Sequence, residues 1–279
     1  MRTSPFFSRL LTISAGLVLI LLILMVVLVF IKSWPFLSDL GAARLWQDNG
    51  WFPQEQQFNI VPMVVGSLLI MVGSVLLAMP LGVLLAIFLR YYAPAPIALI
   101  YYGLVELLAG IPSVVYGLWG LIVLVPLIAQ WVAPGASVLA ACIILALMIL
   151  PLIVLVADDA FKQIPPQWLA AADALALTQW GCLSRIILPH AMPSIGSGVI
   201  LQAGRALGET MAVLMVCGNI VQIPHSIFAP ARTLTANIAL EMAYATDHHS
   251  SALFVSGLVL FLLAMVLVLF AKRLKPSFV

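Results

Sequence analysis

The chain has 279 residues, of which 64% are hydrophobic and only 8% are charged. Because soluble domains carry about 25% charged residues, this composition excludes an ordinary soluble fold. The small net charge of +2 also argues against a nucleic-acid-binding protein.

Long apolar runs dominate the sequence. A run of about 18 or more apolar residues predicts a helix that crosses a bilayer. We therefore predict an all-α integral membrane protein with six spans, divided into a first span with its outer loop (1–60) and a transmembrane core (61–279). The predicted spans are 10–31, 61–89, 97–128, 136–157, 194–220 and 250–271.

The first apolar run follows Arg2 and Arg9, as in a secretory signal. Its 22 residues exceed the core of about 7–15 residues that such signals have. No small-residue cleavage site follows it. We therefore predict that this run is retained as a membrane span.

The second and third predicted spans are longer than the roughly 20 residues that a bilayer requires. Each contains a proline motif, Met79-Pro80-Leu81-Gly82 in one and Ile111-Pro112-Ser113 in the other. Proline removes a backbone donor and clashes with the preceding helical turn. Such long spans tilt, extend beyond the bilayer or break, and these two motifs are the predicted break points.

Lysine and arginine are distributed unevenly between the two sides of the predicted bundle. With the N-terminus inside, eight lie on the cytoplasmic side and three on the outer side. The positive-inside rule then predicts a multi-pass membrane protein with both termini cytoplasmic. The eight are Arg2, Arg9, Arg90, Lys162, Arg185, Lys272, Arg273 and Lys275, and the three are Lys32, Arg44 and Arg232.

The outer connections 33–59 and 221–249 carry aromatic and histidine side chains. The tryptophans of the first predict anchoring at the membrane interface. Neither the histidines of the second nor the cysteines of the chain have the spacing of a standard metal site, so we predict no metal site. These residues are Trp34, Trp46 and Trp51, His225, His248 and His249, and Cys142, Cys182 and Cys217.

The cytoplasmic connection 158–191 is too apolar for a solvated loop. Pro165 and Pro166 suit the start of a helix, where a missing donor costs nothing, and we predict a helix over residues 167–180. An apolar cytoplasmic helix buries one face, either against its own bundle or in a groove of a partner. The residues leave both alternatives open.

Two charged residues, Arg205 and Glu209, fall inside the predicted fifth span. They are four residues apart, so on a continuous helix they would share one face and pair. A charge at the bilayer centre costs about 2.5–3.5 kcal/mol, and such residues usually face a polar pathway or a bundle interior. The two alternatives are a pathway for an anion and a mutually neutralised structural pair.

A third charge within a span is Glu106, which precedes the predicted break at Pro112. It would line the same pathway or hydrogen-bond the freed backbone, and we favour the structural role. After the break, Ser113 and Tyr116 would offer hydroxyls to an anion or bond their own helix.

Four blocks of the sequence resemble permeases of the phosphate ABC importer, of the PstC type rather than the PstA type. The resemblance runs from about residue 61 to the C-terminus. The blocks are P-L-G-V-L-L-A-I-F-L-R-Y-Y-A-P (Pro80–Pro94), L-A-G-I-P-S-V-V-Y-G-L-W-G (Leu108–Gly120), P-P-Q-W-L-A-A-A-D-A-L-A-L-T-Q-W with I-I-L-P (Pro165–Pro189) and G-R-A-L-G-E-T-M-A-V-L-M-V-C-G-N (Gly204–Asn219).

The resemblance implies a six-span type I ABC-importer permease fold in the bacterial inner membrane. In that fold the cytoplasmic connection forms two short helices that dock on an ATPase. This sequence has Ala170 where the family has a glutamate and Ala176 where it has the glycine between the two helices. One charged contact to the ATPase should therefore be missing. The residues implied in coupling are Trp168, Ala170, Ala171, Ala172, Leu175, Ala176, Leu188 and Pro189.

In the family that the sequence resembles, Arg205 and Glu209 match residues implicated in moving phosphate. A guanidinium offers a fixed fork of donors that fits phosphate oxygens. Phosphate keeps a proton near neutral pH that a carboxylate can accept, whereas Glu209 would repel a fully ionised sulfate. The implied substrate pathway consists of Arg205, Glu209, Thr210, Glu106 and Ser113.

The sequence contains no phosphate-binding loop of the G-x-x-x-x-G-K-[ST] type. We therefore expect a permease subunit that is no enzyme and holds no cofactor, with ATP and magnesium in a separate subunit. The implied partners are a PstA-type permease, two ATP-binding subunits, an extracytoplasmic phosphate-binding protein and membrane lipids, but no nucleic acid. Two alternatives are a permease for sulfate or molybdate and, remotely, a membrane enzyme for a lipid phosphate that uses His190 with Asp158 and Asp159.

Overall fold

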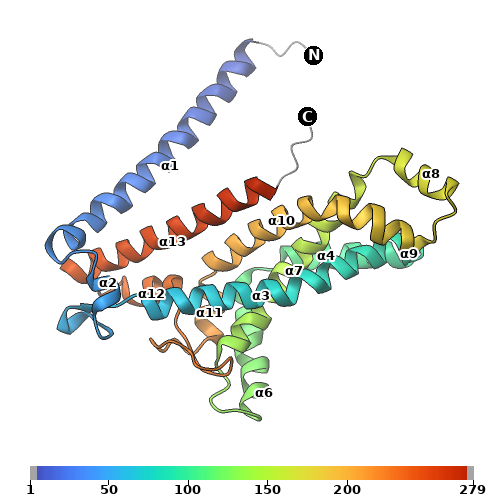
Figure 1. The fold of residues 1–279 in the computed structure, drawn as a ribbon. Helices are drawn as coiled ribbons and strands as arrows, with labels where there is room; N and C mark the ends of the chain where they lie inside the picture. The colour runs from blue at the N-terminus through green and yellow to red at the C-terminus, as the bar shows by residue number, and fades with distance from the viewer. Residues whose placement is uncertain (1–4, 275–279) are drawn as a thin grey trace. The chain divides into compact units, whose positions relative to one another are not determined.

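The computed structural model describes residues 5–274, which are mostly helical (Figure 1). Five helices are long and apolar enough to cross a membrane, and a pair of shorter helices makes a sixth span if it is counted as one. The prediction of an all-α membrane protein is confirmed. The chain forms two compact units, residues 1–60 with 238–259 and residues 61–237 with 260–279, called here the N-terminal unit and the core unit. Arg2 and Lys275, used to predict the orientation, lie outside the described residues.

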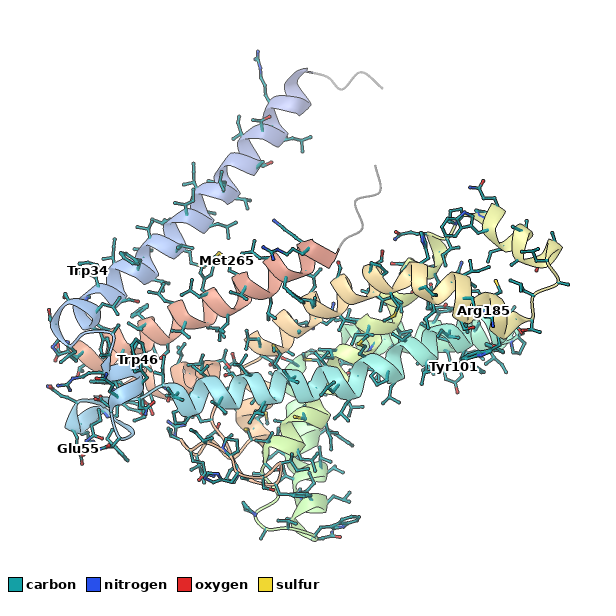
Figure 2. All side chains as sticks on the ribbon, in the orientation of Figure 1. Trp34, Trp46, Glu55, Tyr101, Arg185 and Met265 are labelled. Carbon is teal, nitrogen blue, oxygen red and sulfur yellow. The ribbon has the colours of Figure 1, made fainter. Side chains whose placement is uncertain are left out.

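The N-terminal unit begins with α1 (Pro5–Asp39), which contains the whole predicted first span. None of its most apolar 18-residue stretch is buried within the chain. A helix that is apolar on all sides and exposed in this way suits a lipid environment or a partner helix. Trp34, on the same helix, is exposed, as expected for an interfacial anchor (Figure 2).

After α1 the N-terminal unit forms a small lobe, predicted to be the outer one, of α2 (Arg44–Gln47), β1 (Trp51–Phe52), the 3-10 turn η1 (Pro53–Glu55) and β2 (Gln57–Phe58). The two strands pair antiparallel. Trp46 is exposed, but Trp51 is buried and its indole N–H donates to Glu241 Oε2 at 2.7 Å. The prediction that Trp51 anchors the chain at the interface is therefore wrong, because this indole already has a buried carboxylate partner.

Two further helices contribute to the N-terminal unit, the end of α12 (Leu234–Glu241) and the first part of α13 (Asp247–Leu274). His249 Nε2 lies 2.9 Å from Glu241 Oε2, so that one carboxylate joins the outer lobe to the start of α13. The helix α13 contains the whole predicted sixth span.

The core unit is built around α7 (Val138–Lys162), which packs against α3 (Val61–Ile87) and α10 (Leu188–Gly208). Two-thirds of the most apolar part of α7 is buried. Glycines allow the helices to approach closely: a Cβ added to Gly198 would lie 2.1 Å from Val156, and one added to Gly82 would lie 2.8 Å from Ile153. Small residues at helix contacts are typical of membrane bundles, where close packing replaces the hydrophobic driving force.

The two predicted proline breaks have opposite outcomes. α3 continues through Pro80 to Ile87, so the break predicted there is wrong; a proline is tolerated in a membrane helix where neighbouring protein packs along it. The second break is confirmed, since α4 (Ala95–Gly110) and the stretch Ser113–Ala129 are bent by 93°. The Tyr116 hydroxyl donates to the Leu108 carbonyl across this bend at 2.9 Å. The stretch after the bend consists of α5 (Ser113–Trp119), the π-helical turn η3 (Gly120–Leu124) and α6 (Val125–Ala129).

The connection 158–191 does not form the single helix predicted over residues 167–180, so that prediction is wrong. Helix α8 (Pro166–Ala174) begins at the predicted prolines, but Ala176 takes a left-handed conformation with φ of 52°. The N–H groups of Ala176 and Leu177 bond back to Asp173 and Ala172, which is the Schellman arrangement that ends a helix. Thr178 then caps the next helix by accepting the Gly181 N–H.

The predicted fifth span, 194–220, is also wrong in position. The spanning helix runs from Gln179 to Gly208 through α9 (Gln179–Cys182), the π-helical turn η4 (Leu183–Ile187) and α10. The chain then leaves the helix at Glu209, whose backbone is extended, and a short helix α11 (Met211–Val216) follows. The apolar run continues past Gly208, but the helix does not.

Candidate functional site

The break between α10 and α11 carries the two charged residues that the sequence singled out. Arg205 lies in the last turn of α10, where a cation complements the partial negative charge of the helix C-terminus. Glu209 is the residue at which the backbone becomes extended, with φ of −69° and ψ of 129°. The break therefore lies between the two charges.

Glu209 does not pair with Arg205, so the prediction that the two share one helical face is wrong. Its carboxylate Oε1 accepts the backbone N–H of Ala212 at 3.3 Å and so caps α11. Its backbone carbonyl accepts the Thr235 hydroxyl at 2.9 Å. Because the chain is extended at Glu209, the four-residue spacing no longer corresponds to one helical face.

Arg205 is exposed and makes no hydrogen bond or ion pair within residues 5–274. The glycines on either side of it, Gly204 and Gly208, have open space where a Cβ would stand. A permanently charged guanidinium thus projects from a helix long and apolar enough to span a membrane, with room around it. Such a group needs a partner chain or a polar ligand.

A buried segment that the sequence reasoning missed supports the break. Thr233, Thr235 and Asn237 are at most 6% exposed and lie at the start of α12. Ser67 Oγ on α3 accepts the Leu234 N–H at 3.0 Å, and Thr233 Oγ1 accepts the Ala236 N–H at 3.2 Å. These bonds satisfy N–H groups of the first helical turn that have no partner within the helix.

Arg232 belongs to the same segment, and the sequence analysis used it only to predict orientation. Its Nε donates to the Asn219 carbonyl at 2.8 Å, and its guanidinium donates to Asn237 Oδ1 at 3.0 Å. The Nδ2 group of Asn237 and the Oδ1 atom of Asn219 are buried without a partner among the described residues. The sequence signal that could have identified this segment is R-T-L-T-A-N (232–237), in which four of six residues are polar.

The short helix after the second break packs against the short helix after the first. A Cβ added to Gly117 on α5 would lie 2.7 Å from Ala212 on α11, and one added to Gly120 would lie 2.9 Å from Val216. The two short helices therefore run side by side in the same direction. Thr210, at the start of α11, donates its hydroxyl to the Gly208 carbonyl at 3.4 Å.

Glu106 lies apart from this group. It is exposed on α4 in a shallow hollow lined otherwise by apolar residues and Gly103, and it makes no hydrogen bond within residues 5–274. The structural role that we favoured for it, bonding the backbone freed at Pro112, is wrong because the Tyr116 hydroxyl takes that position. An exposed carboxylate on an apolar helix still requires a partner or a polar path.

The coupling residues predicted from the resemblance divide into a buried face and an exposed face of α8. Ala172 is buried and Trp168 packs edge-on against the His190 ring, with ring centroids 4.5 Å apart. Leu175 is 73% exposed, and Trp180 on α9 is 66% exposed. One face therefore packs on the chain itself and the other presents apolar side chains that suit a partner's groove. Ala170, Ala171, Ala176 and Pro189 are exposed as well, and Leu188 is half-buried.

The residues on which the enzyme alternative depended are divided between two places. Asp158 is engaged by Arg90, Lys162 and Tyr102. His190 packs edge-on against the Trp168 ring and lines one pocket with Asp159.

Comparison with known proteins gives one consistent result. Residues 78–279 match the family described as binding-protein-dependent transport system inner membrane component. The phosphate transport system permease protein PstC of Mesorhizobium japonicum is 36% identical, over 93% of this chain and 86% of its own length. The PstC protein of Haemophilus influenzae is 33% identical over 94% and 90%. A probable ABC transporter permease of Bacillus subtilis, YqgH, is 38% identical over 81% and 75%.

Two solved structures have the same fold at low sequence identity. A chain of a bacterial alginate ABC transporter, in complex with a pentasaccharide-bound periplasmic protein, superposes with a TM-score of 0.67 at 16% identity, covering 97% of this chain and 93% of that one. A chain of the inward-facing methionine transporter MetNI gives 0.60 at 20% identity, covering 77% and 93%.

Proposed function

Because the chain belongs to the family of binding-protein-dependent transport system inner membrane components, we propose that it moves inorganic phosphate across the membrane. It is a multi-pass permease subunit that works with an ATPase and a substrate-binding protein. Support for phosphate as the cargo comes from relatives named as phosphate transport permeases, which align over most of their length.

The exposed and unpaired Arg205 is the observation that carries the proposed mechanism. Its guanidinium is charged at every physiological pH and presents donors in a fork that fits two phosphate oxygens. Open space beside Gly204 and Gly208 leaves room for an anion against this face of α10. In our proposal Arg205 binds the passing phosphate directly.

The other pathway residues act around this contact. Glu209 accepts the proton that phosphate carries near neutral pH and repels a fully ionised anion such as sulfate. Thr210 and Ser113, at the adjoining ends of α11 and α5, offer hydroxyls to the phosphate oxygens. Glu106, on the exposed face of α4, lines the part of the path that a second permease completes.

One chain of this kind encloses no complete polar route, since Arg205 and Glu106 are exposed on it. We propose a heterodimer with a PstA-type permease, above two ATP-binding subunits and below a phosphate-binding protein. Both termini are cytoplasmic in this arrangement, as the lysine and arginine distribution predicts. The ATP and magnesium belong to the ATPase, and alternating access opens the path to each side in turn.

The proposal is tested by phosphate uptake in cells that carry all the subunits, at matched membrane expression. Arg205→Ala should lower uptake by at least about 30-fold, the effect of removing one partner from a desolvated charge contact. Arg273→Ala, an exposed arginine at the end of α13, is the matched control and should keep wild-type uptake. Undiminished phosphate uptake by Arg205→Ala, with the ATPase still copurifying, would defeat the assignment of the site.

The alternative cargoes are tested in the same cells. Uptake of sulfate and molybdate is measured beside that of phosphate for the wild type. If either is taken up in preference, the fold and the role of Arg205 stand, but the cargo is not phosphate.

A further inference from the structure

The proposed pathway leaves one buried charged group of the core unit without a role. Asp158, near the end of α7, has a side chain that is 3% exposed. Its Oδ1 accepts from the Arg90 guanidinium at 3.1 Å and from the Tyr102 hydroxyl at 2.8 Å, and its Oδ2 lies 2.6 Å from Lys162 Nζ. These four residues are called here the Asp158 cluster. They come from three helical stretches. Arg90 lies in the π-helical turn η2 (Phe88–Tyr92) at the end of α3, Tyr102 lies in α4, and Asp158 and Lys162 lie in α7.

The π-helical turn that carries Arg90 has a second contact. The next residue, Tyr91, packs its ring against Phe161 on α7 at 5.8 Å between centroids. The Tyr91 carbonyl accepts the Gln179 side-chain amide at 2.6 Å. Gln179 is the first residue of the continuous helix that ends beside Arg205. The π-helical turn η2 therefore contacts the two regions through adjacent residues: Arg90 bonds Asp158, and Tyr91 bonds Gln179 at the start of α9.

This position is between the coupling helix and the pathway. The loop Leu175–Thr178 connects α8 directly to Gln179, so a movement of α8 pulls on α9 and, through the Gln179–Tyr91 bond, on η2. Figure 2 labels Tyr101, the neighbour of Tyr102, and Arg185, which follows α9, at the end of the core unit where α8 and α9 lie. π-Helical turns are rare and occur frequently at functional sites.

A purely structural role would not require a charge here. The rest of α7 is buried through apolar side chains, and apolar packing serves membrane bundles well. A buried carboxylate with three donors is instead directional, since it holds its partners in one arrangement and loses several bonds together when one helix turns. A set of bonds of this kind is either formed or broken as a whole, so the helices that it joins have separate, distinct arrangements. Energetic coupling between distant sites is carried by networks that have two such arrangements.

We propose that the Asp158 cluster and the Gln179–Tyr91 bond are the positioning contacts that pass the movement of the coupling helix to α3, α4 and α7. Asp158 holds the ends of these helices as one body, and Gln179 joins that body to the helix that carries Arg205. The inference rests on membership of the importer permease family and not on phosphate as the cargo. None of these residues touches the transported anion.

The test uses the whole transporter in lipid vesicles, with anion uptake and ATP hydrolysis measured in parallel. Asp158→Asn keeps the shape of the side chain, Tyr102→Phe removes one hydroxyl and Gln179→Ala removes the bond to Tyr91. Each should lower the anion transported per ATP hydrolysed, by about tenfold for Asp158→Asn, which lies within the usual range of coupling effects. ATP hydrolysis itself should stay within about twofold of wild type, because the ATPase is untouched.

Asp159→Asn is the matched control. Asp159 is the adjacent carboxylate, its side chain is 68% exposed and it contacts only Lys162 of the cluster. It should leave the ratio of transport to hydrolysis at the wild-type value. Combining Asp158→Asn with Gln179→Ala should uncouple little more than the stronger single change, since contacts in one chain of transmission are not additive.

Two results would overturn the inference. One is an Asp158→Asn variant that couples as well as Asp159→Asn. The other is a parallel loss of uptake and hydrolysis in Tyr102→Phe and Gln179→Ala, which would mean that the cluster only holds the fold; these milder variants decide the matter if Asp158→Asn fails to assemble. A wild-type complex that moves no phosphate would defeat the proposed cargo instead, and stimulation of ATP hydrolysis by the binding protein would still report the coupling.

Discussion

Two charged regions of the core unit differ in whether the charged side chains have partners within the chain. In the Asp158 cluster, a buried carboxylate has three donors at 2.6–3.1 Å, all supplied by the chain itself. At the break after α10, Arg205 has no partner within residues 5–274, and Glu209 only caps a helix. The first region is complete in one subunit, whereas the second is not.

This difference separates two uses of charge in an apolar chain. A charge that the chain satisfies internally holds helices in place, and its removal should be felt as lost stability or lost coordination between helices. A charge left exposed on an apolar helix is costly unless something else meets it, so its partner lies outside the chain. Arg205 therefore requires a ligand or a second subunit as its partner, whereas Asp158 is already paired within the chain.

The difference between the two charged regions is tested most directly by the effects of Asp158→Ala and Arg205→Ala on stability. Asp158→Ala should lower the free energy of unfolding of the detergent-solubilised complex by about 2 kcal/mol, because hydrogen bonds to a charged group are lost together. Arg205→Ala should leave it unchanged, since it removes no contact within the chain. Thermal unfolding followed by light scattering measures both. Equal destabilisation by the two changes would mean that the charges play the same role.

Glu209→Gln sharpens the account of the unpaired region. The amide keeps an oxygen that accepts the Ala212 N–H, so α11 should remain capped. It cannot accept a proton from phosphate and no longer repels a dianion, so we expect phosphate uptake to fall by about tenfold and its preference over sulfate to shrink. Competition of phosphate uptake by sulfate checks this, with Glu55→Gln on the exposed outer turn as control. An unchanged anion preference would contradict the role given to Glu209.

Thr235→Val tests whether the hydrogen bond from Thr235 to the Glu209 carbonyl stabilises the break between α10 and α11. The substitution keeps the side-chain shape and leaves the Glu209 carbonyl without its hydroxyl donor. A lost hydrogen bond of this kind costs about 1 kcal/mol, and we expect a drop of that size in stability together with a fall of a few-fold in uptake. Thr246→Val, at an exposed position, should change neither. Wild-type uptake by Thr235→Val would show that the break needs no such support.

Ala176→Gly should have the smallest effect and the opposite sign. Ala176 has φ of 52° at the end of α8, a conformation that glycine adopts without strain. The substitution should stabilise the α8–α9 turn by up to about 1 kcal/mol, since alanine pays for a left-handed backbone. Protection of the turn from limited proteolysis reports this, and Ala174→Gly, inside α8, should act in the opposite direction. Faster cleavage of Ala176→Gly would contradict the Schellman ending.

Part of the fold followed from local sequence alone. The six spans were predicted because apolar runs of bilayer length have no other stable environment. The bend at Pro112 and the start of α8 at Pro166 were predicted because proline restricts its own residue and its immediate neighbours. The family was recognised from motifs for the same reason: motifs are local. Arg205 was singled out because a charge in an apolar run stands out whatever surrounds it.

Other features depended on contacts that span long stretches of sequence. The carbonyl of Glu209, where the helix ends, accepts the hydroxyl of Thr235, 26 residues further on. Asp158 is satisfied by Arg90 and Tyr102, 68 and 56 residues away. Pro80 failed to break α3 because packing against neighbouring helices can outweigh the lost backbone donor. The sequence by itself determined which apolar runs are long enough to span a membrane and which charged residues lie among them. Only the tertiary structure decided where the fifth span begins and ends and which of those charges the chain neutralises, because partners so distant in sequence meet only when the helices pack.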